Sequence, residues 1–258
     1  FSDGLSPFVA EKCSSMIVDT FQSKVLGNER PIWIRRPSVG SCETLTVFLD
    51  GEFYRERVDA PSVIDALKGE IADSWFVFVS MGTIEARWRE CPCHPPFAQA
   101  IVEELLPWLH LRFPEIRTVQ KRVLVGLSYT GLAAAFVARQ YPDMFQRVIC
   151  QSGSFWWNDC WLVEQIRVQP PTSTAYFLDV GTKEVQTHVR HREDVLQIVS
   201  QIEGVRRFRD ALHGTGHAVR YVEFEGGHEF AAWKRMLPDA LRWALAVRSG
   251  VPTTPCTP

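Results

Sequence analysis

Residues 122–140 read RVLVGLSYTGLAAAFVARQ, and this stretch decides the fold. The run at 122–126 is typical of a buried strand, and the apolar spacing at 132–140 predicts a helix. Between them, Ser128 stands two residues after Gly126. A strand, a serine on a sharp turn and an immediate helix are the context of a nucleophile elbow. The alternative interpretation is a serine that caps the helix at an ordinary strand-to-helix junction.

The stretch departs from the usual G-x-S-x-G pattern at one position. Thr130 occupies the place of the second glycine, and Gly131 follows it. We therefore expect a tighter or slightly displaced turn. The helix N-terminus behind Ser128 still favours negative charge that develops near the serine during a reaction. The stretch thus predicts a nucleophilic serine at 128.

Outside this stretch, strands and helices alternate at the spacing of an α/β fold. The predicted strands cover 18–26, 31–36, 43–49, 74–80, 122–126, 147–152, 175–180 and 220–224. The predicted helices cover 63–68, 97–113, 132–140, 191–212 and 231–247. From residue 43 onward this alternation predicts a mainly parallel sheet with helices on both faces. The first two strands follow one another directly, which predicts an antiparallel N-terminal edge.

Composition excludes several classes of protein. Of the 258 residues, 46% are hydrophobic and 22% charged, unlike a disordered chain, a collagen-like repeat or a coiled coil. Twenty-eight basic against 30 acidic residues leave a net charge of −2, so no basic field predicts nucleic-acid or anionic-membrane binding. No long linker interrupts the chain. We expect one domain over 1–258, with a core at about 18–248 and a frayed tail at 249–258; the oligomeric state stays open.

The cysteines and histidines argue against a metal or another cofactor. Seven cysteines are scattered along the chain, and the closest pair, Cys91 and Cys93, lacks the two-residue gap of a zinc knuckle. We expect reduced thiols in a cytoplasmic protein. A zinc hydrolase is a weak alternative, because a glycine-rich turn separates two of the histidines and no H-E-x-x-H motif occurs. The histidines concerned are His188, His191, His213 and His217.

The stretch 225–230, EGGHEF, lies between the last predicted strand and the last helix. A triad histidine belongs on this loop, after the nucleophile and the acid in chain order. Its ordinary pKa lies near working pH, so His228 could take a proton from Ser128 and return it. The two preceding glycines let the loop turn toward the serine. Paired with the elbow, His228 is the predicted general base.

The acid of the triad is less closely specified. It should lie after the predicted strand 175–180, where Asp179 and Glu184 both occur. Glu184 is preferred because it stands on the loop proper, where a carboxylate could orient the histidine. Asp179 lies within the strand, and Asp194, or no acid at all, remains open.

An oxyanion hole needs two backbone N–H donors. The N–H of Tyr129, directly after the nucleophile, is one candidate. The other should come from the loop after 43–49, where Gly51 permits a bend that aims the next N–H inward. We therefore predict Glu52 as the second donor.

Short motifs along most of the chain match one known family in order. They are LDG at 49–51, RWREC at 87–91, EELLPW at 103–108, RQYPDMF at 139–145, QSGSFWW at 151–157, GTKE at 181–184 and GGH at 226–228. Over about residues 20–245 the chain resembles the enterochelin-esterase-like group of α/β-hydrolases. That group includes siderophore trilactone esterases and is related to esterase D, feruloyl esterases and mycolyltransferases. Cys91 replaces the leucine of the family's R-x-R-E-L motif.

The resemblance implies a Ser-His-acid esterase of the α/β-hydrolase fold that passes through an acyl-enzyme on a small-molecule ester. Some siderophore esterases work with a serine–histidine dyad, so the acid stays open. Trp156 and Trp157 follow a strand and could stack on an aromatic acyl group, or simply pack beneath the loop. Arg87 and Arg89 could pair with an anionic substrate such as a catecholate siderophore, or form surface salt bridges.

Two other functions fit the same residues. An acyltransferase of this fold would use the same triad and exclude water from the acyl-enzyme. A non-catalytic ligand-binding domain would explain Thr130 and the uncertain acid, although Ser128 and His228 argue against it.

Overall fold

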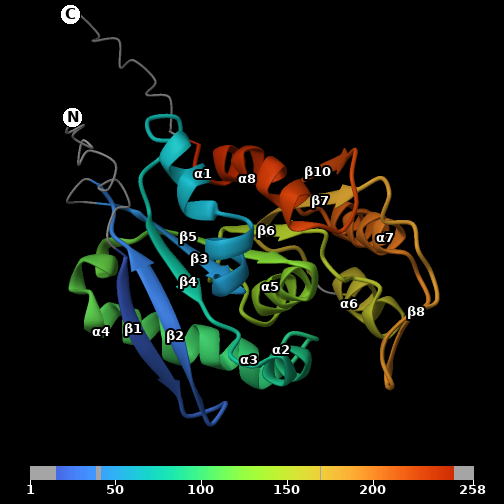
Figure 1. Cartoon of the computed structure of the whole chain (residues 1–258), viewed down its shortest axis with the longest axis horizontal. Coiled ribbons are helices and arrows are strands. Elements are labelled where there is room, and N and C mark those ends of the chain that lie inside the picture. The colour runs from blue at the N-terminus through green and yellow to red at the C-terminus, as the bar shows by residue number, and fades with distance from the viewer. Residues whose placement is uncertain (1–15, 39–41, 169, 247–258) are drawn as a thin grey trace, which may run out of the picture.

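The computed structural model describes residues 16–38, 42–168 and 170–246, and an eight-stranded sheet forms its centre (Figure 1). The strand order is β1-β2-β4-β3-β5-β6-β7-β10. In chain order the strands are β1 (Ile17–Ser23), β2 (Asn28–Arg35), β3 (Thr44–Leu49), β4 (Trp75–Val79), β5 (Lys121–Leu127), β6 (Arg147–Gln151), β7 (Ala175–Gly181) and β10 (Val219–Phe224). The frayed tail expected at 249–258 lies outside the described residues.

Most of the sheet is parallel. β1 and β2 pair antiparallel, β2 pairs antiparallel with β4, and every further pairing, from β4–β3 to β7–β10, is parallel. The burial follows from this topology. β3 and β4 are buried throughout because helices cover both faces, whereas β1 at the edge alternates exposed side chains with partly or fully buried ones. The predicted parallel sheet with an antiparallel N-terminal edge is confirmed.

Two layers of helices enclose the sheet (Figure 1). One face packs against α1 and α8, and the other against α3 to α7. Alternate residues of β5 point to opposite faces of the sheet. Leu124 packs in the hydrophobic core on one face, and Val125 packs in the core on the other. The helices are η1 (Phe53–Arg57), α1 (Ala60–Ala66), α2 (Ile84–Glu90), α3 (Pro95–Gln99), η2 (Ala100–Leu105), α4 (Leu106–Arg112), η3 (Pro114–Thr118), α5 (Ser128–Gln140), α6 (Trp157–Arg167), α7 (Gln201–Gly214) and α8 (Phe230–Ala244).

The predicted helix over 191–212 is wrong in its first part. A two-stranded antiparallel hairpin, β8 (Val189–Arg192) and β9 (Val195–Gln197), occupies that stretch. α7 begins only after Ser200, whose hydroxyl accepts the N–H of Glu203 at 3.3 Å. This cap satisfies a donor at the helix N-terminus, so the helix starts there and not ten residues earlier.

The segment between β4 and α3 holds a helix that the sequence analysis did not predict. Thr83 caps α2 by accepting the N–H of Ala86 at 3.1 Å. No helix of the described residues is long and apolar enough to span a lipid bilayer. The cysteines that the structure describes are unpaired thiols, namely Cys42, Cys91, Cys93, Cys150 and Cys160.

Candidate active site

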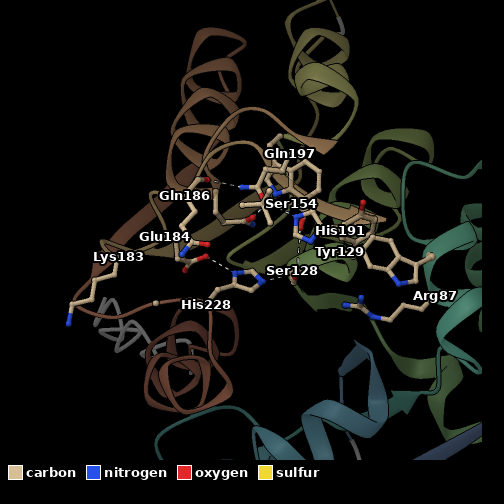
Figure 2. A pocket seen from close by; sticks show the side chains of 15 residues that line it. Arg87, Ser128, Tyr129, Ser154, Lys183, Glu184, Gln186, His191, Gln197 and His228 are labelled. Carbon is tan, nitrogen blue, oxygen red and sulfur yellow. Dashed lines mark hydrogen bonds and ion pairs between the residues drawn. The ribbon is translucent and has the colours of Figure 1, made fainter. Parts of the chain in front are cut away.

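The carboxyl ends of four neighbouring parallel strands, β5, β6, β7 and β10, meet at one edge of the sheet. Ser128 follows β5, Ser152 follows β6, Glu184 lies on the loop after β7, and His228 lies on the loop after β10. Parallel strands bring these loops together, which is why ligand sites form at this edge in α/β sheets. Figure 2 shows Ser128, Glu184 and His228 pointing toward one another.

The turn at Ser128 has the geometry of a nucleophile elbow. Ser128 has φ 51°, a left-handed conformation that is rare for a residue with a side chain. The turn is so sharp that a Cβ at Gly126 would lie 2.1 Å from the carbonyl oxygen of Thr130. Glycine is therefore required at 126. The Ser128 carbonyl accepts the N–H of Ser154 at 3.0 Å, which holds the strained residue in place.

A continuous hydrogen-bond path joins the serine to a buried carboxylate. The Nε2 atom of His228 lies 2.9 Å from Oγ of Ser128, and its Nδ1 atom lies 2.6 Å from Oε2 of Glu184. The carboxylate accepts from Nδ1–H, which leaves Nε2 free to accept the serine proton. The Glu184 side chain is 1% exposed and His228 is 40% exposed, so the imidazole faces the cavity and the carboxylate stands behind it.

The structure separates the candidate acids. Asp179 is buried, and its carboxylate accepts the N–H of Ser152 at 3.1 Å and the side-chain amide of Gln151 at 3.3 Å. Burial raises the pKa of Asp179 to about 7, against the lowering effect of these two donors. Asp194 lies in the turn between β8 and β9, and its side chain is 80% exposed beside Arg192. Glu184 is the carboxylate that hydrogen-bonds His228.

Thr130, the residue that breaks the glycine pattern, is completely buried and has a defined partner. Its hydroxyl lies 2.9 Å from Oδ2 of Asp50 and 2.8 Å from the carbonyl oxygen of Leu127. The one hydroxyl proton favours the charged acceptor, Asp50. Arg87 from α2 also binds Asp50, with two contacts of 2.8 Å. A buried network therefore ties the elbow to the loop after β3.

That loop carries Glu52, the predicted second oxyanion donor. Asp50 has φ 57°, and Gly51 packs so closely that a Cβ there would lie 2.8 Å from the backbone of Phe78. Glu52 begins a helical turn, and its carboxylate accepts the hydroxyl of Ser80. Tyr129, the first predicted donor, directly follows Ser128 at the start of α5.

A cavity of about 470 Å³ opens beside Ser128. One wall is aromatic. The rings of Trp156 and His191 stack with centroids 5.0 Å apart and an interplanar angle of 8°, and the rings of Trp88 and Tyr129 meet at 4.6 Å. The lining residues are Arg87, Trp88, Ser128, Tyr129, Ser154, Trp156, Lys183, Glu184, Gln186, Val189, His191, Gln197, Gln201, Gly227 and His228.

The predicted substrate-binding residues divide into two groups. Arg87 and Trp156 line the cavity. The other two lie outside the lining: Arg89 is 60% exposed and binds Glu90 at 2.8 Å, and Trp157 contacts Trp161. The contacts of Arg89 and Trp157 are those of the alternative interpretation, an ion pair and packing against another tryptophan.

Several lining residues were missed by the sequence analysis. Val189, His191 and Gln197 come from the hairpin that had been predicted as helix, and Gln201 lies at the start of α7. A capping pattern at 200–203, Ser-Gln-Ile-Glu, was the available signal that the helix starts late. Within the described part of the chain, no group of three or more His, Cys, Asp or Glu residues is arranged to hold a metal ion.

Comparison with known proteins places the chain in a family. A family model described as "Putative esterase" matches residues 23–244. The chain belongs to this esterase family. The predicted resemblance to the enterochelin-esterase-like group is confirmed by its relatives.

This esterase-family chain is 28% identical over 238 residues to the iron(III) enterobactin esterase of Dickeya dadantii, an alignment covering 87% of the chain and 54% of the relative. It therefore spans about half the length of the curated relatives that it matches.

Two solved structures illustrate the shared fold. The enterobactin esterase of Shigella flexneri, crystallised in the presence of 2,3-dihydroxy-N-benzoyl-serine, has a TM-score of 0.74 at 22% identity and covers 92% of this chain and 59% of that one. An IroE-like serine hydrolase from Shewanella oneidensis has a TM-score of 0.72 at 19% identity. The match covers 89% of this chain and 79% of that one. The fold of the esterase-family chain is the α/β-hydrolase fold.

Proposed function

We propose that this chain is a serine-dependent carboxylic ester hydrolase that works through Ser128, His228 and Glu184. One observation carries the proposal, namely the unbroken path from Ser128 Oγ to His228 Nε2 at 2.9 Å and from His228 Nδ1 to Glu184 Oε2 at 2.6 Å. The strained elbow and the adjacent cavity support it, since a nucleophile must project into a space that admits substrate.

The reaction steps follow from which of these groups can donate a proton and which can accept one. Ser128 attacks the ester carbonyl while His228 takes its proton, forming a tetrahedral intermediate. The intermediate collapses to an acyl-enzyme as His228 protonates the leaving alcohol. Water then attacks the acyl-enzyme, with His228 as base again, and releases the acid. Glu184 keeps the imidazole in the tautomer that accepts at Nε2 and stabilises the imidazolium that forms.

Backbone donors would stabilise the oxyanion. We assign the N–H of Tyr129, at the N-terminus of α5, and the N–H of Glu52 to this role. The bond between Thr130 and Asp50 supports the pairing, because it fixes the two donor-bearing segments against each other. Such donors act in the transition state without having to reorganise.

We propose an ester with an aromatic acyl or acylamino group, of the siderophore class, as the substrate. The aromatic wall of Trp88, Tyr129, Trp156 and His191 offers flat surfaces on which a phenolic ring could stack. Lys183 adds a cationic group for an anionic substrate, and Arg87, whose guanidinium binds Asp50, lines the same cavity. The names of the enterobactin esterases similar to this chain support the same class.

The test of the nucleophile uses a p-nitrophenyl short-chain ester and a fluorophosphonate. The wild type should turn over the ester and gain one phosphonyl adduct by intact mass. Ser128→Ala should lose about 10⁴-fold or more in kcat and gain no adduct, while its circular dichroism stays unchanged. A folded wild type that shows neither turnover nor adduct would contradict the proposal.

The substrate class is tested by comparing kcat/KM values at one pH. The kcat/KM values for a catecholate trilactone and for a feruloyl ester should both exceed the value for an aliphatic ester with a similar leaving group. Equal kcat/KM values for aromatic and aliphatic acyl groups would contradict the proposed aromatic specificity but not the proposed esterase activity.

We also propose a cytoplasmic location, supported by the unpaired thiols of the described cysteines.

A further inference from the structure

Ser152, which directly follows β6, is completely buried and has φ 44°, a conformation that costs a non-glycine residue free energy. Its backbone is held at both ends. Its N–H donates to the carbonyl of Asp179 at 3.0 Å, and its carbonyl accepts the side-chain amide of Gln201 at 2.5 Å. Such strain persists where the surroundings over-determine a conformation, and it is concentrated at functional sites.

The hydroxyl of Ser152 joins two side chains of the site. Its oxygen lies 2.6 Å from Oε1 of Glu184 and 3.1 Å from Nε1 of Trp233. An indole N–H only donates and a carboxylate only accepts, so the hydroxyl accepts from Trp233 and its one proton points at Glu184. The direction of this hydrogen bond is therefore fixed.

This bond determines which oxygen of Glu184 faces the histidine. Oε1 accepts both the Ser152 hydroxyl and the N–H of Gly181 at 2.8 Å. With Oε1 doubly occupied, Oε2 is presented to Nδ1 of His228. The ring of Trp233 also packs edge-on against His228, with centroids 4.8 Å apart. One tryptophan thus contacts the base with its ring and the acid, through Ser152, with its N–H.

We propose that Ser152 and Trp233 are positioning residues for the acid of the triad, acting as a relay from the Trp233 N–H through the Ser152 hydroxyl to Glu184. The inference rests on the proposed esterase function and goes beyond it. The relay holds the carboxylate in the single orientation in which it can orient the imidazole. Through Ser152, β6 also contributes to the site, although this strand supplies no reacting group.

The variant that tests the relay is Ser152→Ala. Alanine keeps the Cβ at the strained φ and removes only the hydroxyl. We expect kcat to fall about 10-fold with KM within about twofold of wild type, as for the loss of one hydrogen bond to a charged group. Trp233→Phe keeps a ring beside His228 and should cost about threefold, because the hydroxyl can still donate to Glu184.

A double-mutant cycle distinguishes positioning from general damage. In the Glu184→Ala background, Ser152→Ala should cause no further loss of kcat, because the carboxylate on which it acts is gone. Ser74→Ala is the matched control. Ser74 is also completely buried, with its hydroxyl bonded to backbone carbonyls of Thr44 and Trp75 near the opposite ends of the strands. That variant should lose stability and keep its kcat.

Other results would contradict the proposed role of Ser152 or the proposed function. An equal fold-loss of kcat from Ser152→Ala in both backgrounds, or a wild-type kcat in Ser152→Ala, would overturn the relay while the esterase activity stands. Full kcat in Glu184→Ala would overturn it as well and would indicate a serine–histidine dyad. A wild type that neither turns over an ester nor reacts with fluorophosphonate would instead refute the proposed function itself.

Discussion

The carboxylate of Asp50 accepts a hydrogen bond from the hydroxyl of Thr130 across 2.9 Å, although 80 positions separate the two residues in the chain. Both side chains are buried. The bond links the loop after β3 to the first turn of α5, the two segments to which we assign the oxyanion donors. A glycine at 130, as in the usual elbow pattern, could not make it. The departure from G-x-S-x-G therefore has a structural counterpart at Asp50.

Replacing Thr130 by valine should lower the free energy of unfolding by about 1.5–3 kcal/mol, the usual value of a hydrogen bond to a charged group. Valine has nearly the same shape and lacks the hydroxyl. Thr130→Ser keeps the hydroxyl and should lose less. Urea unfolding of the two variants measures the difference. Wild-type stability in Thr130→Val would contradict a stabilising role for the bond to Asp50.

Two arginines on α2 should differ sharply in their contribution to stability. Arg87→Ala would leave the buried Asp50 without its bidentate partner, and breaking a buried pair costs about 3–5 kcal/mol. Arg89→Ala removes an exposed side chain and should change the free energy of unfolding by less than about 0.5 kcal/mol. Denaturant unfolding of both variants gives the comparison. Similar values would show that Arg87 does not stabilise Asp50.

The two neighbouring carboxyl groups should have different effects on catalysis. Glu184→Gln should lower kcat by about 10²-fold or more, yet by less than Ser128→Ala, as is usual for the acid of a triad. Asp179→Asn should cost at least about tenfold less than Glu184→Gln, because Asp179 does not contact His228. Steady-state kinetics on one ester decide between them. The reverse order would identify Asp179 as the acid.

The buried Asp179 should make stability fall as the pH rises. Its pKa is about 7 in the folded protein, where burial raises it, against about 3.9 for an unfolded aspartate. Between about pH 4 and pH 7 the native state therefore binds more protons than the unfolded state, and the free energy of unfolding decreases with increasing pH. Urea unfolding at pH 5 and pH 8 should show a smaller decrease for Asp179→Asn than for wild type. Parallel curves would contradict the raised pKa.

The hairpin wall should affect substrate binding more than the chemical step. His191→Ala removes half of the stack with Trp156, so KM for an aromatic acyl ester should rise about 3–10-fold relative to p-nitrophenyl acetate. His188→Ala is a suitable control, because this residue just before β8 does not line the cavity. If the two variants shifted KM equally for both esters, the stacked wall would have no part in selecting substrate.

The sequence predicted the sheet and the positions of Ser128, Glu184 and His228, because these depend on local patterns. An apolar strand followed by a small-residue turn has few possible structures, and a loop after a parallel strand can only reach the carboxyl edge. The roles of these residues stay predictions until activity is measured. The single domain expected over 1–258 also stays a prediction.

What the sequence could not predict depends on contacts between distant segments. Ser152 resembles any serine after a strand, and only the folded protein brings Trp233 and Glu184 to its hydroxyl. The hairpin at 189–197 was missed because its polar residues suit an exposed helix as well as an exposed hairpin. Its antiparallel pairing, and the cap at Ser200, decide the matter.

Each of four adjacent strands contributes one member of the site, and the last of them, β10, stands at the edge of the sheet and pairs with β7. His228 follows that strand. A chain emerging from the ribosome completes its N-terminal elements first. The proposed nucleophile, Ser128, is thus synthesised about a hundred residues before the proposed base, His228, and lacks this hydrogen-bond partner until β10 is in place. On the proposed mechanism, a nascent or truncated chain that lacks β10 would not cleave an ester, so ester cleavage would report the completed sheet.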